Sequence, residues 1–174
     1  MRFALIASVS LAACASVPSP DTAKATSVAA ASGPGATAPS FVLAADLVAL
    51  ADRLPAGDPE ASCTGKVTVT IDPTPRGALR LATARFEVTV ANCAADTVIT
   101  DVHVHRGSEN VLAIDATISQ LTLTNGKGSG SSINPGVRPS AIDEIVADIT
   151  AFYVNLHSKR HPAGFMRGEL RRGL

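Results

Sequence analysis

Apolar and polar residues alternate along much of the chain from residue 66 onward, and this period of two is typical of half-buried β-strands. Residues 66–72 read KVTVTID, with a valine or isoleucine at every second position. The run 72–77 (DPTPRG) predicts a turn, because its prolines cannot continue a hydrogen-bonded ladder. Residues 84–90 alternate again, which completes a predicted β-hairpin. We expect further strands at 98–105, 111–118 and 121–124, and a glycine-rich loop at 125–130.

One helix is predicted shortly before the C-terminal residues. Ser140 is a candidate cap, because Asp143 follows it at the spacing of a capping box. An apolar stripe at helical spacing continues the segment, at Ile142, Ile145, Val146 and Ile149. The whole pattern predicts an all-β fold: an antiparallel Greek-key β-sandwich or barrel with one short α-helix before the final strands.

Composition narrows the classes of partner. The chain has 174 residues, and its 15 basic and 15 acidic side chains balance. Such a balance produces no field that would attract a polyanion. Aromatic residues make up only 3% of the chain, and tryptophan is absent, so a platform for stacking bases is not expected. We therefore expect no nucleic-acid partner.

The N-terminal residues resemble an export signal. Arg2 precedes an apolar run, 3–13, that is too short to span a bilayer. The sequence at 11–14, LAAC, resembles a bacterial lipobox, in which the thiol of Cys14 is lipidated. The alternative is an ordinary export signal with an incidental cysteine. We expect an exported protein, lipid-anchored at the cell envelope (outer membrane or periplasmic face), whose membrane contact is the lipid on Cys14.

This expectation divides the chain into three parts. Residues 1–14 are predicted to be a lipoprotein signal peptide. Residues 15–40 are rich in Ala, Ser, Thr, Pro and Gly and lack large apolar side chains, so they predict a flexible tether. Residues 41–174 form the predicted β domain.

Two motifs in this domain resemble the chordin-type (CHRD) domain family. Residues 99–107 read ITDVHVHRG, and residues 153–170 read YVNLHSKRHPAGFMRGEL. The family typically shows a His-x-His strand in mid-domain. It closes with a Tyr-Val-Asn-x-His strand, a Pro/Gly turn and an Arg-Gly-x-Leu ending. The resemblance covers roughly residues 47–174 and implies a non-enzymatic binding or structural domain, with an envelope protein or polysaccharide as a possible partner.

The start of the domain departs from the family pattern. In the family, a first strand precedes a Glu-Val-Pro-Pro element, but residues 54–59 here read LPAGDP. Within 41–54, leucines also recur at the i,i+4 spacing of a helix. The structure of 41–54 is therefore left open between strand and helix.

The remaining cysteines, Cys63 and Cys93, are predicted to form a disulfide. They precede and follow the hairpin strands, and an exported domain folds in an oxidising compartment. Strand parity, however, places Cys63 on the face of Val67 and Cys93 on the face opposite Val88. A bulge, or cysteines beyond the ladder, would have to correct this difference. The alternative is two free thiols.

The histidines predict a possible metal site. His103 and His105 are two residues apart on one strand, so both project from the face opposite the core. His157 lies on the outer face of the later strand together with Tyr153 and Asn155. If the two strands are neighbours, three imidazoles converge, and such a set suits copper or zinc. The alternative is that these histidines are polar surface or hydrogen-bonding residues.

Nearby polar residues complete the candidate site. Asp101 shares the face of His103 and is expected to orient an imidazole. Asn155 and Tyr153 are expected to hydrogen-bond near the histidines. Arg167 is assigned a structural role, pairing with a carboxylate or with loop carbonyls. We expect His161 to be a solvated loop residue, Met166 and Leu170 to point inward, and Phe165 to point outward with Arg167.

A second, weaker resemblance concerns the copper–zinc superoxide dismutases, whose copper-ligand strand also reads His-Val-His. A long zinc loop with several histidines is missing here, and so is an obvious bridging histidine. Serine-nucleophile and phosphate-loop motifs are missing as well. We therefore expect a non-enzymatic protein, with copper binding as the alternative function and a dismutase-like redox enzyme as the least favoured one.

Overall fold

The computed structural model describes residues 39–76, 81–107 and 110–174. The predicted signal peptide at 1–14 and the predicted tether at 15–40, apart from its last two residues, lie outside this part of the chain. The strands are β1 (Phe41–Ala49), β2 (Thr64–Arg76), β3 (Leu81–Ala91), β4 (Val98–Arg106), β5 (Val111–Thr122), β6 (Gly128–Val137), β7 (Phe152–Ser158), β8 (Met166–Glu169) and β9 (Arg171–Arg172). A short helix, α1 (Pro139–Ala147), and a 3-10 turn, η1 (Ile149–Ala151), precede β7.

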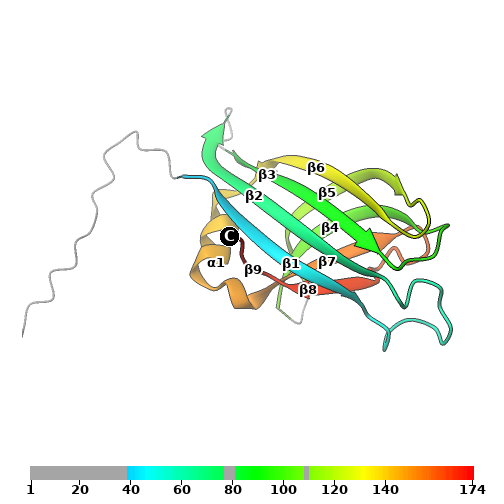
Figure 1. The fold of residues 1–174 in the computed structure, drawn as a ribbon. Coiled ribbons are helices and arrows are strands. Elements are labelled where there is room, and N and C mark those ends of the chain that lie inside the picture. The colour runs from blue at the N-terminus through cyan, green and yellow to red at the C-terminus, as the bar shows by residue number, and fades with distance from the viewer. Residues whose placement is uncertain (1–38, 77–80, 108–109) are drawn as a thin grey trace, which may run out of the picture. The chain divides into compact units, whose positions relative to one another are not determined.

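The strands form one antiparallel sheet in the order β5-β4-β7-β8-β1-β2-β3-β6, with β9 also paired to β1. The sheet curls into a nearly closed barrel, so that β1, β2 and β3 lie in front in Figure 1 and β4, β5 and β7 lie behind them. The two ends of this strand order, β5 and β6, meet at a seam. There, hydrogen bonds from side chains of β6 to backbone carbonyls of β5 join the two strands in place of a backbone ladder. Ser132 Oγ donates to the carbonyl of Thr117 at 2.6 Å, and Asn134 Nδ2 donates to the carbonyl of Asp115 at 2.8 Å.

Across this seam the connections follow a Greek key. Strands β4, β5 and β6 are consecutive neighbours, and β7 returns to lie beside β4. The resulting spatial order, β7-β4-β5-β6, is that of the Greek-key motif. The predicted fold class is confirmed, and the return of β7 to β4 places the two histidine strands side by side.

The core lies inside the barrel and follows the predicted alternation. Val67, Val69 and Ile71 of β2 face Phe86 and Val88 of β3, and all five are buried. The helix α1 contributes Ile142 and Ile145 to the same core. No helix within the described ranges is both long enough and apolar enough to cross a lipid bilayer.

At the ends of two elements, the structure decides one alternative that the sequence left open and corrects one prediction. Residues 41–54, left open between helix and strand, begin with the strand β1, which pairs with β2 on one side and with β8 and β9 on the other. Ser140 does not cap α1. The N-cap is Arg138, Pro139 stands in the first turn, and within the described residues the cap makes no side-chain hydrogen bond. A proline at this position suits a helix start because its φ angle is already helical and it has no amide hydrogen to leave unpaired.

The glycine-rich loop predicted at 125–130 is also only partly correct, because β6 begins at Gly128. A Cβ atom at Gly128 would lie 2.8 Å from a side-chain carbon of Leu123, and one at Gly130 would lie 3.3 Å from a side-chain carbon of Leu121. The absence of side chains on β6 makes room for leucines from the end of β5 and the residues after it. Here glycine is a packing requirement within a strand.

The structure contains the Cys63–Cys93 disulfide, with the Cα atoms 4.4 Å apart. The ladder of β2 and β3 ends at the pair Thr64 and Ala91, one residue after Cys63 and two residues before Cys93. Asn92 then adopts a left-handed conformation, with φ of 59°. This turn of the backbone removes the parity conflict, because Cys93 no longer follows the alternation of β3. Asn92 is held there by its own side chain, whose Nδ2 donates to Thr64 Oγ1 at 3.0 Å.

Candidate metal centre

The antiparallel pairing of β4 and β7 positions the three histidines of the candidate site. His103 pairs with Asn155, and His105 pairs with Tyr153. His157 lies opposite Asp101. Since Val102, Val104, Val154 and Leu156 occupy the core face of the same strands, these polar side chains share the outer face.

The three imidazoles gather closely on that face. The ring centroids of His103 and His157 are 4.4 Å apart, and those of His103 and His105 are 5.5 Å apart. One ring nitrogen from each residue lies within 4.8 Å of the other two. His105 and His157 are buried, whereas His103 is half-buried.

Two backbone carbonyls orient the buried rings. Nδ1 of His105 donates to the carbonyl oxygen of Asn110 at 3.2 Å, and Nδ1 of His157 donates to that of Pro162 at 2.9 Å. A carbonyl oxygen can only accept, so the proton of each neutral ring is on Nδ1 and the lone pair is on Nε2. Both Nε2 atoms are buried, and neither has a hydrogen-bond partner among the described residues.

The surroundings favour the neutral form of two of the rings, those of His103 and His105. Burial lowers the pKa of His103 and of His105, and the neighbouring His157 lowers both further. The charges of Asp101 and Asp115 oppose this shift at His103. At neutral pH the unprotonated nitrogens are therefore free to act as donors to a metal ion.

The orienting groups differ from those expected. Among the described residues no hydrogen bond joins Asp101 to an imidazole, and its effect on His103 is through its charge. Sequence reasoning missed Asn110 and Pro162, although each lies five residues after its histidine, across a turn. Backbone carbonyls carry no side-chain signature, so only the turn itself could have indicated them.

Two further side chains, Tyr153 and Arg167, stack in turn on the ring of His105. The ring of Tyr153 lies nearly parallel to that of His105, with centroids 5.4 Å apart. The guanidinium of Arg167 lies 3.5 Å from the centroid of the Tyr153 ring. Tyr153 donates its hydroxyl hydrogen to Asn110 Oδ1, so Asn110 supports both the tyrosine and His105. Burial raises the pKa of Tyr153, which keeps the phenol protonated.

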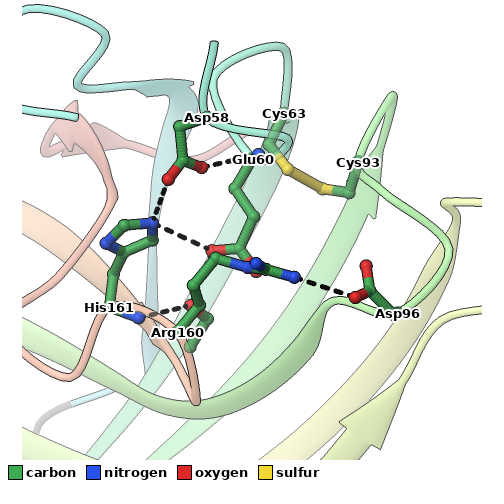
Figure 2. A network of polar contacts seen from close by, with 8 residues as sticks. Asp58, Glu60, Cys63, Cys93, Asp96, Arg160 and His161 are labelled. Atoms are coloured by element: carbon green, nitrogen blue, oxygen red, sulfur yellow. Dashed lines mark hydrogen bonds and ion pairs between the residues drawn. A yellow bond between two sulfur atoms is a disulfide. The ribbon is translucent and has the colours of Figure 1, made fainter. Parts of the chain in front are cut away.

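A second polar cluster holds the loop before β2 against the turn after β7 (Figure 2). His161 Nε2 donates to Asp58 Oδ2 at 3.0 Å, and Ser158 Oγ donates to Glu60 Oε2 at 2.6 Å. Arg160 bridges Asp96 at 2.8 Å and Glu60 at 3.8 Å. Each carboxylate is already engaged by a cation or a hydrogen-bond donor, so we assign this cluster a structural role.

Two expectations for the residues in and next to this cluster are wrong. His161 is not a solvated loop residue, because only 17% of its side chain is exposed and it pairs with Asp58. Phe165, expected to point outward, is fully buried, and its ring lies 6.3 Å from that of His161. The backbone between the two residues turns at Gly164, whose φ is 97°, so strand parity does not extend back to Phe165.

The described residues thus define an antiparallel, nearly closed β-barrel domain with a polar cluster on one outer face. The family profile of the CHRD domain matches residues 40–170. The chain belongs to the CHRD domain family, which supports a structural or binding role for this domain. Searches of curated proteins and of solved structures return no match.

Proposed function

We propose that this domain binds a transition-metal ion, with copper favoured, through His103, His105 and His157. The observation that carries the proposal is the pair of buried Nε2 atoms on His105 and His157, which have no hydrogen-bond partner in the described part of the chain. Leaving a buried polar atom unsatisfied costs about 1–3 kcal/mol, so two such atoms side by side call for a ligand. Both rings are also held by hydrogen bonds at Nδ1, the arrangement typical of histidines that ligate a metal through Nε2.

Copper suits this donor set better than other divalent ions. Imidazole nitrogens bind both copper and zinc, and the affinity of nitrogen sites for divalent first-row metals peaks at Cu(II). A water molecule hydrogen-bonded to the two Nε2 atoms is the competing account of the same geometry. The two accounts predict different binding. A metal site holds its ion tightly and prefers one metal to others, whereas a site built for water does neither.

Isothermal titration with Cu(II), Cu(I) and Zn(II) tests the proposal. We would use the whole chain with Cys14→Ser, because a free thiol would itself bind copper. We expect one tightly bound copper ion per chain and a loss of affinity of at least about 100-fold in the double variant His103→Ala/His157→Ala. Binding should weaken at acidic pH, where protons compete for the imidazoles. Because burial lowers the pKa of His103 and His105, the weakening should set in below the ordinary imidazole pKa of about 6.5 and not at it.

His161→Ala is the matched control, because it removes an imidazole from the second cluster and should leave copper affinity unchanged. Affinity that survives the double variant, or no binding by either protein, would refute the metal site. The search would then turn to an envelope protein or polysaccharide partner. We propose a binding role without turnover, and superoxide consumption by the copper-loaded protein that disappears in the double variant would contradict that part.

We further propose that lipid on Cys14 anchors the protein in the cell envelope. The support is the LAAC motif at 11–14, together with a disulfide of the kind that persists in oxidising compartments. In a bacterial host, the wild-type protein should sediment with membranes and resist high salt, whereas Cys14→Ser should appear in the soluble fraction. Retention of the Cys14→Ser protein in the membranes would show that another element anchors it.

A further inference from the structure

A cleft of about 650 Å³ opens beside the histidine cluster, on the far side of Tyr153. Its walls are the residues that follow β1, the turn between β7 and β8, and the outer face of those two strands. The polar network of Figure 2 holds one wall in place, because Arg160 and His161 line the cleft while their partners Asp58 and Glu60 lie behind them. The three metal-site histidines do not line this cleft, so it is a separate cavity.

The cleft carries more positive than negative charge. Three arginines line it, Arg53, Arg160 and Arg167, against a single carboxylate, that of Glu169. Arg160 is already paired with Asp96 and Glu60. The guanidinium of Arg167 lies over the Tyr153 ring and reaches Glu169 only at 3.4 Å, so most of its hydrogen-bond donors remain available. No carboxylate in the described part of the chain pairs with Arg53, whose side chain is solvent-accessible.

The floor of the cleft contains an unsatisfied acceptor. Asn155 is only 6% exposed, and its Oδ1 has no hydrogen-bond partner among the described residues. Gly164 leaves room for this amide, because a Cβ atom there would lie 2.3 Å from Nδ2 and 2.5 Å from Oδ1 of Asn155. A residue with a side chain at position 164 would therefore push Asn155 away. The glycine is required both for this contact and for its φ of 97°.

We propose that this cleft binds a small organic anion that carries a carboxylate and a nearby hydroxyl group, the chemistry of a sugar acid. The carboxylate accepts hydrogen bonds from Arg167 and Arg53, since a planar guanidinium matches a carboxylate in two parallel hydrogen bonds. The hydroxyl donates to Asn155 Oδ1 and satisfies the buried acceptor. The proposal does not require a metal at the histidine cluster.

Tyr153 gives a direct readout of this site. It is the only tyrosine of the chain, and tryptophan is absent, so the intrinsic emission of the protein reports on one ring at the edge of the cleft. We would titrate the whole chain carrying Cys14→Ser with D-glucuronate in the presence of a chelator, which removes any effect of metal. Calorimetry would follow the same titration. D-Glucose, which lacks the carboxylate, and acetate, which lacks the hydroxyls, are the comparison probes.

We expect a saturable change in tyrosine emission with D-glucuronate, at least about tenfold weaker binding of acetate, and no binding of D-glucose. Arg53→Gln and Arg167→Gln should each weaken D-glucuronate binding by about tenfold or more. Arg53 is the safer variant for folding, because its side chain is exposed and makes no ion pair in the described structure. Arg172→Gln removes the same charge from β9, away from the cleft, and should bind normally.

Three results would overturn the proposal. They are no saturable binding of D-glucuronate, equal binding of D-glucose, or an equal loss of affinity in Arg172→Gln. The last would mean that net charge alone attracts the anion. Because the chelator excludes metal, failure here leaves the copper proposal standing, and failure of the copper titration leaves this one standing.

Discussion

Replacing Cys63 and Cys93 by serine should lower the free energy of unfolding by about 3–4 kcal/mol. The bridge joins residues 30 apart in the sequence, and without it the unfolded chain regains the conformational freedom of that loop. The covalent bond lies where the β2–β3 ladder ends, next to the loop that carries Asp58 and Glu60, so its loss also removes one of the links that hold that loop. Urea denaturation of the wild-type protein and the double serine variant, both oxidised, measures the difference.

The same comparison under reducing conditions is the control. Once the wild-type disulfide is reduced, the two proteins should unfold at nearly the same urea concentration. A difference that persisted would come from the serine side chains and not from the cross-link. Two reactive thiols in the oxidised, denatured wild-type protein (apart from Cys14) would contradict the bridge itself.

Gly168→Ala should destabilise the domain by about 3 kcal/mol, because it forces two backbones apart. A Cβ atom at Gly168 would lie 2.1 Å from the carbonyl oxygen of Asp46 on β1. Since the obstacle is backbone, no side-chain rotation relieves it. The ladder of β1 with β8 and then β9 is interrupted at this point, so the glycine allows the close approach of the chains there.

Gly57→Ala is the matched control for this substitution. Gly57 has a left-handed backbone, with φ of 77°, but no atom lies within 4 Å of a Cβ placed there. Its replacement should cost only about 1 kcal/mol, the penalty of a left-handed alanine. Urea denaturation of both variants gives the comparison. A Gly168→Ala protein no less stable than Gly57→Ala would mean that β1 and β8 tolerate separation.

Local patterns in the sequence predict the strands of the first hairpin well. The alternation at 66–72 and 84–90 was sufficient to predict the first hairpin, because a half-buried strand repeats its environment every two residues. The same rule placed His103 and His105 on one face of their strand. The alternation rule did not predict β6, because the glycines of this strand have no side chains and so leave room for Leu121 and Leu123, which lie outside it.

By itself, the sequence determined that the domain is antiparallel and all-β, that Cys63 and Cys93 lie at the ends of one hairpin, and that the histidine motifs lie on strands. Each of these depends on residues close together in the chain. Tertiary structure decided which strands become neighbours. Pairing of β4 with β7 across some fifty residues brings His157 to His103, and no local period encodes that pairing.

Finer features of the site also depend on tertiary contacts. Three features depend on backbone geometry or on a distant partner. They are the left-handed turn at Asn92 that corrects the cysteine parity, the carbonyls of Asn110 and Pro162 that orient the imidazoles, and the hydrogen bond between Asp58 and His161. Backbone carbonyls are identical at every position, and the last pair is 103 residues apart in the sequence. The local carbonyls leave no trace in the side-chain pattern, and only the folded barrel brings Asp58 to His161, so both features are seen only in the structure.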